Sequence, residues 1–306
     1  MENTIMLQSS SCALRWINCQ CFEIKLPNGK TILTDPCYDY PENTGHPIAD
    51  LFRLKGFTTA ELEGCDYLIL NHTHGDHIAN LEEVIMKFNP VVICHSGVAA
   101  EIAEVCRDMP LTSIYAVNYD GTYFFDGFKL ETFHGVHKPQ KFTWRQSMAE
   151  GDDISQQPKL TRLHTLGGLF NMNYMLTMEN GFRLAFVGGM DDGMAQRLPI
   201  LRPNVVLRNK ITNDRDVEKV AGDWYDFMKE SYAQVVIPMH FEVWENMEPG
   251  FSKQTFDYAN KMAEESGLNC CMLAPRRTEW YCVQMVITKR HQKAEQAVTD
   301  GVHVQR

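Results

Sequence analysis

Apolar and polar residues alternate along the opening of the chain, which is the pattern of β-strands. In CFEIKLPNGKTILTDP the alternation continues on both sides of Asn28-Gly29. This dipeptide favours a two-residue hairpin, because both turn positions take positive φ. The stretch ALRWINCQCFEIKLPNGKTILTDP therefore predicts an antiparallel meander that ends at Asp35-Pro36.

The spacing of apolar residues then changes to strand–helix alternation. DYLILNHTH predicts a buried strand, and DHIANLEEVIMKFNP predicts one helix that ends before Pro90. A short helix is expected from Thr58 to Cys65. VVICHS predicts a further strand, and VAAEIAEVCRDM predicts the helix that follows it.

A second meander and a second set of strand–helix units follow. TYFFDGFKLETF and FNMNYMLTMENGFRLAFVGG each predict a hairpin, with turns at Asp126-Gly127 and Asn180-Gly181. The last third predicts a strand around Val205–Leu207, a helix from about Asp214 to Tyr232, the strand QVVIPMH, a helix from about Lys253 to Ser266, and a final strand pair at CCML and WYCVQMVIT.

Both halves combine a meander with strand–helix units, which predicts the α/β class. We expect a four-layer αββα sandwich of two mixed β-sheets with helices outside. Residues 1–290 are expected to form a single domain, and 291–306 a polar C-terminal tail, frayed or left over from expression. Residues 138–168 lack periodicity and predict a lid-like excursion, since such long loops are uncommon unless functional or disordered.

Composition narrows the class of protein. The chain has 306 residues, and its hydrophobic fraction of 44% supports the core of a soluble globular protein. Its formal net charge of −10, without a basic cluster, disfavours nucleic-acid partners. No apolar run reaches the roughly 20 residues of a membrane span, and no secretory signal begins the chain. The ten cysteines lack framework spacing and predict reduced thiols in the cytoplasm.

The stretch HTHGDH carries the strongest chemical signal. His72 and His74 are one residue apart at the end of a predicted strand, so both side chains can reach one metal ion. Asp76 and His77 follow where the chain turns into a helix, and they point to a second position nearby. Imidazole and carboxylate groups are the ligands that zinc and similar divalent metals accept in hydrolytic sites.

Further ligand candidates follow other predicted strands. His134 and His137 lie in KLETFHGVHKP, Asp191 and Asp192 in LAFVGGMDDG, and His240 in VVIPMHFE. A position at the end of a rigid strand is the placement expected of a site residue.

The series TDP, HTHGDH, HGVH, GMDD and IPMH resembles the five motifs of the metallo-β-lactamase superfamily, in the family's order from Asp35 to His240. The start ILTDP and the end PMH are most similar to the L-ascorbate-6-phosphate lactonase-like and N-acylphosphatidylethanolamine phospholipase-like branch. The resemblance implies the metallo-β-lactamase fold and two divalent metal ions, with zinc favoured over manganese or iron.

The resemblance also implies a set of metal ligands. They are His72, His74 and His137 for the first ion, Asp76, His77 and His240 for the second, and Asp191 as the bridge. His134 remains an alternative, although Gly135 meets the branch pattern of a small residue two places before His137. Asp192 remains an alternative because MDDG departs from the family's Gly-Asp. Asp35 is expected to orient the histidine loop from behind the ligands.

The function implied is metal-dependent hydrolysis. A hydroxide bridging the two ions would open a lactone or similar cyclic ester, with Asp76 as the catalytic residue that holds or relays its proton. The alternative is a phosphodiesterase of the same fold. The partner is then a small-molecule ester or phosphoester, and a homo-oligomer stays open. Candidates for the substrate pocket are Trp144, His164 and Trp244.

Two other classes are less favoured. A di-iron redox relative would carry a flavodoxin-like domain of about 100 residues, which does not fit into the chain after His240. A non-catalytic binding protein of this fold would be expected to lose ligands, whereas the set here is complete.

Overall fold

The computed structural model describes residues 12–40, 52–111, 113–137, 159–189, 194–210, 212, 214–285 and the backbone of 302–305. These residues form two mixed β-sheets. The first contains, in spatial order, β15 (Val302–Gln305), β14 (Trp280–Met285), β1 (Cys12–Asn18), β2 (Cys21–Lys25), β3 (Thr31–Thr34), β4 (Tyr67–Ile69), β5 (Val91–His95) and β6 (Ile114–Val117). The second contains β13 (Cys271–Met272), β12 (Val235–Met239), β11 (Val205–Asn209), β10 (Arg183–Val187), β9 (Asn171–Met178), β8 (Phe128–Gly135) and β7 (Thr122–Phe125).

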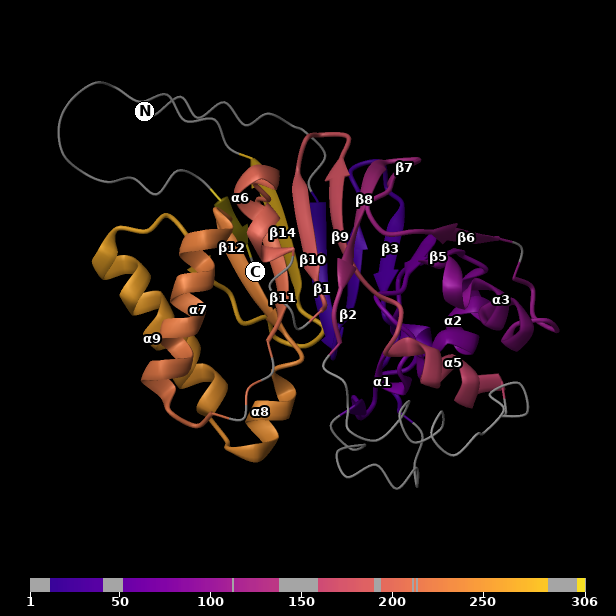
Figure 1. Cartoon of the computed structure of the whole chain (residues 1–306), viewed down its shortest axis with the longest axis horizontal. Helices are drawn as coiled ribbons and strands as arrows, with labels where there is room; N and C mark the ends of the chain where they lie inside the picture. The colour runs from indigo at the N-terminus through magenta and orange to yellow at the C-terminus, as the bar shows by residue number, and fades with distance from the viewer. Residues whose placement is uncertain are drawn as a thin grey trace.

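Helices cover the outer faces of both sheets. Those on the side of the first sheet are η2 (Thr59–Glu61), α1 (Gly75–Ile78), α2 (Leu81–Phe88), α3 (Ser96–Val105) and α5 (Lys159–Gly167). Those on the side of the second are η4 (Ala195–Arg197), α6 (Leu198–Leu201), α7 (Val217–Ser231), α8 (Glu242–Met247) and α9 (Phe251–Ser266). Figure 1 shows the sheets between these two helical groups, which confirms the predicted αββα sandwich. No helix in the described ranges has both the length and the apolar character needed to span a bilayer.

The central strands are buried on both faces, which explains their nearly continuous apolar sequences. In β4, Ile69 packs between the two sheets, whereas its neighbour Leu68 packs beneath α2 and α3. In β12, Ile237 packs between the sheets and Val236 beneath α7 and α9. Successive side chains of a strand point to opposite faces, so a sheet covered on both sides needs apolar residues at every position.

The predicted hairpins form, but the first lacks the two-residue turn with positive φ at both positions. The backbone N–H of Leu26 donates to the carbonyl of Lys30, so residues 27–29 form a three-residue loop, in which Gly29 but not Asn28 has positive φ. Strands β1, β2 and β3 pair antiparallel, and Gly29 between the last two has φ of 87°. The turn between β7 and β8 places Gly127 at φ 100°, in the region that favours glycine. The turn between β9 and β10 does the same with Gly181 at 83°.

The single helix predicted for DHIANLEEVIMKFNP is wrong, because the chain forms α1 and α2 with a break at Ala79-Asn80. The side-chain oxygen of Asn80 accepts hydrogen bonds from the backbone N–H groups of Tyr38 and Asp39, at 2.8 and 2.9 Å. Its own N–H donates to the carbonyl of Pro36 at 2.9 Å. This residue therefore bonds to the loop after β3 instead of continuing a helix.

Two smaller predictions are also wrong. The helix expected from Thr58 to Cys65 is only the single turn η2, closed by a capping box between Thr58 and Glu61. The segments CCML and WYCVQMVIT do not pair with each other. Strand β13 lies parallel to β12, and β14 lies antiparallel to β1 in the other sheet.

The predicted excursion at 138–168 is wrong at its end. Residues 138–158 lie outside the described residues, but Lys159–Gly167 form helix α5. Leu163 is fully buried in the core beneath this helix. The apolar residues of this helix are spaced three apart in the sequence, and the polar residues between them obscured the helical pattern. The polar tail predicted at 291–306 is wrong for Val302–Gln305, because β15 pairs with β14.

Candidate metal centre

The sequence motifs meet at one edge of the sandwich. His72 and His74 follow β4 of the first sheet, whereas His137 follows β8 and His240 follows β12 of the second. Nε2 of His240 lies 3.2 Å from Oδ2 of Asp76, so side chains from the two sheets come into direct contact there. The site thus lies where loops from both sheets converge.

The first group of metal-ligand side chains is His72, His74 and His137. One ring nitrogen from each lies within 4.8 Å of the others. Nε2 of His72 is 3.2 Å from Nδ1 of His74. The ring centroid of His137 is 5.1 Å from that of His72 and 4.5 Å from that of His74. Three imidazoles converge here as three ligands of one divalent ion would.

The second group is Asp76, His77 and His240, whose ligand atoms also lie within 4.8 Å of one another. Oδ2 of Asp76 is 3.7 Å from Nε2 of His77 and 3.2 Å from Nε2 of His240. The ring of His77 is also 3.8 Å, centroid to centroid, from that of His72. The two groups are therefore neighbours that could hold two ions side by side.

Two histidines are oriented through their Nδ1 atoms. Nδ1 of His72 is 2.8 Å from Oδ1 of Asn71, and Nδ1 of His77 is 2.9 Å from Oδ2 of Asp35. Both partners accept hydrogen bonds, so each Nδ1 carries the proton and each Nε2 keeps its lone pair. Asp35 also accepts the backbone N–H of Asn71 at 2.7 Å, so it lies behind the histidine loop, in contact with both Asn71 and His77.

His240 is oriented in the same way. Its Nδ1 is 2.9 Å from Oε1 of Glu242, which lies two residues later in the first turn of α8. Both side chains are nearly inaccessible to solvent. The carboxylate fixes the ring so that Nε2 faces Asp76, which is the arrangement found behind histidine ligands of metals.

Burial keeps two of the imidazoles neutral. Desolvation and the neighbouring His77 hold the pKa of His72 well below its usual range. Desolvation and His137 lower the pKa of His74 to about 3. A cluster of uncharged imidazoles with converging nitrogens offers lone pairs without protons to displace, which fits a metal ion.

The second group has mixed charges. Burial alone would raise the pKa of Asp76, but His77 and the hydrogen bond from His240 hold it well below the usual value. For His240, burial favours the neutral form, yet Glu242 and Asp76 raise its pKa to about 10. Without an ion, an imidazolium thus lies between two carboxylates. Counted with Glu242, the two carboxylates outweigh the imidazolium by one negative charge, which suits a divalent cation that displaces the proton of His240.

The structure separates the two histidines of the third motif. His134 is exposed on β8, with its ring against Tyr119 at a centroid distance of 4.6 Å. His137 lies past the end of the strand and joins His72 and His74. The geometry therefore brings His137, and not His134, to the candidate centre.

The other predicted site residues divide into three cases. Asp191, Asp192 and Trp144 lie outside the described residues. The ring of His164 is 5.0 Å from that of His74. Trp244 is not a pocket wall, because it is 1% exposed and packs in the core against Trp224 at 6.1 Å.

Sequence reasoning missed Asn71 and Glu242, which hold His72 and His240. Both are polar residues within two positions of a predicted ligand. Their closeness to the histidines was the available signal, since buried polar residues need hydrogen-bond partners. Only the folded structure shows which histidine each of these residues contacts.

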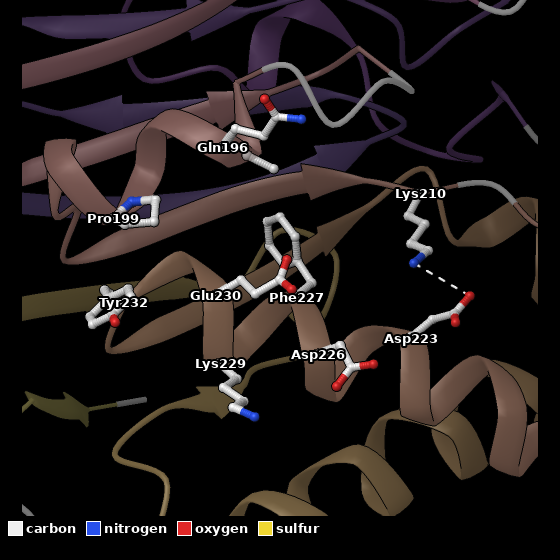
Figure 2. Close-up of a pocket in the computed structure, with 10 residues that line it drawn as sticks. Gln196, Pro199, Lys210, Asp223, Asp226, Phe227, Lys229, Glu230 and Tyr232 are labelled. Atoms are coloured by element: carbon white, nitrogen blue, oxygen red, sulfur yellow. Dashed lines mark ion pairs between the residues drawn. The ribbon is translucent and has the colours of Figure 1, made fainter.

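A groove of about 920 Å³ lies elsewhere, between α7 and the η4–α6 segment, as Figure 2 shows. Lys210 and Asp223 form an ion pair of 3.5 Å there. The lining residues include no histidine or cysteine. Among the described residues, no group of three metal-ligand side chains lies in this groove, so the chemistry is concentrated at the histidine cluster.

Comparison with known proteins agrees with this geometry. The profile of the family described as "Beta-lactamase superfamily domain" matches residues 13–240. A "UPF0173 metal-dependent hydrolase" of Methanobrevibacter smithii is 23% identical over 82% of this chain and 89% of its own length. Another protein of that description, from Bacillus cereus (strain ZK / E33L), is 31% identical over 78% of this chain and 88% of its own length.

A solved structure has the same fold. The structure of Igni18, described as a novel metallo hydrolase from Ignicoccus hospitalis, aligns with a TM-score of 0.55 at 14% identity. The alignment covers 92% of this chain and all of that one. The match to the family profile extends over most of the sandwich and includes HTHGDH and His240. The chain belongs to the β-lactamase superfamily, and its relatives there are described as metal-dependent hydrolases.

Proposed function

We propose that this chain is a dinuclear metal-dependent hydrolase that opens a lactone or similar cyclic ester. One observation carries the proposal: two groups of three ligand side chains lie side by side at one edge of the sandwich. His72, His74 and His137 would hold the first ion, and Asp76, His77 and His240 the second. The descriptions of the relatives as metal-dependent hydrolases support metal-dependent hydrolysis.

Divalent ions, when bound, lower the pKa of water and polarise a carbonyl or phosphoryl oxygen. The chain itself supplies an ionised carboxylate at Asp76, because His77 and His240 hold the pKa of this group well below its usual value although desolvation raises it. Its side chain is 24% exposed, whereas that of His77 is 2% exposed. Asp76 would therefore accept a hydrogen bond from a water molecule at the edge of the site that solvent reaches, and hold or relay its proton.

The choice of a lactone rests on the resemblance of ILTDP and IPMH to the lactonase-like branch. A phosphodiester would need the same nucleophile and the same electrophilic assistance. For the metal, the imidazole-rich ligand set favours zinc, and manganese or iron would bind the same residues. A substrate screen must therefore contain lactones and phosphodiesters, each assayed with all three metals.

The experiment is a comparison of wild type with the double variant His72→Ala/His74→Ala. We expect hydrolysis by the wild type and background rates for the double variant, because both ligands of one group are lost. His134→Ala is the matched control, since this histidine is exposed on β8. Equal rates for wild type and the double variant would contradict the proposal. A preference for phosphodiesters would retain the metal chemistry and replace the lactone.

A further inference from the structure

Helix α5 contacts the histidine loop, although it lies far away in the sequence. The hydroxyl of Thr73 donates a hydrogen bond of 2.6 Å to the backbone carbonyl of Leu163, 90 residues later. The backbone N–H of Gly75 donates to Nδ1 of His164 at 2.8 Å. Thr73 and Leu163 are completely buried. The loop is thus bonded to α5 on both sides of His74.

The end of α5 presses directly on the backbone of His74. A Cβ atom placed on Gly167 would lie 2.6 Å from the backbone N of His74 and 2.6 Å from the backbone C of Thr73. A Cβ atom on Gly168 would lie 3.3 Å from Nε2 of His74. Real Cβ atoms do not approach backbone atoms at 2.6 Å. Any side chain at Gly167 would therefore move the loop or the helix.

The helix is itself anchored and cannot simply yield. Leu163 belongs to the core beneath α3, and Nε of Arg162 is 2.9 Å from Oε2 of Glu101 on α3. Figure 1 shows α5 beside both α3 and α1. The loop between β4 and α1 is consequently held between its own sheet and a helix packed on that sheet's outer layer.

We propose that α5 positions the metal-binding loop, with Thr73, His164 and Gly167 as the positioning residues. They keep His74 where its Nδ1 lies 3.2 Å from Nε2 of His72. This inference rests on the proposed metal centre and names further residues on which its geometry depends. If the loop is already ordered before the ion binds, metal affinity is not reduced by the entropy cost of ordering it.

Conservative variants separate positioning from general stability. Gly167→Ala adds one methyl group against the loop, and Gly222→Ala is its matched control, because a Cβ atom at Gly222 in α7 meets nothing within 4 Å. Thr73→Val removes the hydroxyl at nearly constant shape. Thr73→Ser restores the hydroxyl and serves as the rescue.

Three measurements are made on each full-length variant. Hydrogen exchange of the amides of residues 72–75 in metal-free protein reports how firmly the loop is held. Competition with a chelator gives zinc affinity, and the visible spectrum of the cobalt-substituted protein reports ligand geometry. We expect Gly167→Ala and Thr73→Val to speed exchange, change the spectrum and weaken zinc binding by about 10- to 100-fold, as loss of supporting contacts does. Thr73→Ser and Gly222→Ala should behave like wild type.

The outcomes separate this inference from the proposed function. A wild type that binds zinc, with unchanged affinity and spectrum in folded Gly167→Ala and Thr73→Val, overturns the positioning role and leaves the metal centre intact. A wild type that binds no zinc, cobalt or manganese contradicts the proposed function, and with it the positioning of a metal ligand. In that case, faster hydrogen exchange of residues 72–75 in the variants would show only that α5 stabilises the loop.

Discussion

Nε2 of His240 lies 3.2 Å from Oδ2 of Asp76, and this contact joins residues 164 positions apart in the sequence. Asp76 belongs to α1 after the first sheet, whereas His240 follows β12 in the second. A site built across two sheets is only as well ordered as the packing between them. The aromatic and aliphatic core between the sheets therefore supports the candidate centre directly.

Zinc binding to the second group should strengthen as pH rises. Burial opposes the charge of His240, but Glu242 and Asp76 outweigh burial and raise its pKa from 6.5 to about 10. The ion must displace that proton, so affinity should increase about tenfold per pH unit below pH 10. Chelator competition between about pH 7 and pH 9 measures this slope. An affinity independent of pH would show that His240 releases no proton.

The same protonation affects the stability of the metal-free protein. The folded pKa of His240 lies above the unfolded value, so its contribution is fully present below about pH 6.5 and is lost as pH rises through about 10. We expect the free energy of unfolding in urea to fall across this window. Saturating zinc should abolish the fall, because the bound ion replaces the proton.

Glu242→Gln should lower both the pKa of His240 and the affinity for the second ion. The variant keeps the shape of the side chain but removes one of the two carboxylates that raise this pKa. The His240 proton is then released more easily, but loss of the carboxylate that holds the ring should outweigh this, so we expect zinc affinity to fall by about 10- to 100-fold, as for other supporting partners of metal-binding histidines. The exposed Glu248 supplies the control Glu248→Gln. If both variants bind zinc equally well, the carboxylate at 242 does not support the site.

Asp35→Asn should disturb the orientation of His77 without distorting the backbone at residue 35. Asp35 has φ of 35°, in the left-handed region that Asn tolerates well. The amide cannot accept from both His77 and the N–H of Asn71, so one of these bonds is lost. Metal content after dialysis should fall below that of wild type. Asp39→Asn, at a side chain that is 56% exposed, is the control and should retain wild-type metal content.

Trp244→Phe should affect stability and leave catalysis unchanged. The ring is 1% exposed and packs against Phe251 and Phe256 at 6.1 and 5.9 Å. The smaller ring leaves a void that should cost about 1–3 kcal/mol of unfolding free energy, measured in urea. Because the side chain lies in the core, KM for any substrate found should not change. A raised KM at unchanged stability would instead indicate that Trp244 lines the substrate pocket.

The fold was largely predictable because the strands follow simple periodicities. Hairpins at Gly29, Gly127 and Gly181 were visible as turn residues between alternating segments. The helix break at Asn80 could not be predicted, because it depends on hydrogen bonds with the backbone N–H groups of Tyr38 and Asp39 that exist only in the folded chain.

The candidate site was predictable in part for the same reason. Candidate ligands after strands could be found by position, but the choice between His134 and His137 depends on where β8 ends, which periodicity does not define. The contribution of α5 was hidden as well, because Leu163 is surrounded in sequence by polar residues. Contacts between distant segments thus account for most of what the sequence did not predict.

The candidate metal centre is best tested by measuring the metal content of protein purified without added metal, with Asp76→Ala as the comparison. Zinc, manganese and iron per chain are measured by mass spectrometry. We predict about two equivalents in wild type and a sharp fall in Asp76→Ala, since Asp76 contacts both His77 and His240. Protein that carries no metal, and binds none when zinc or manganese is added, would contradict the metal centre.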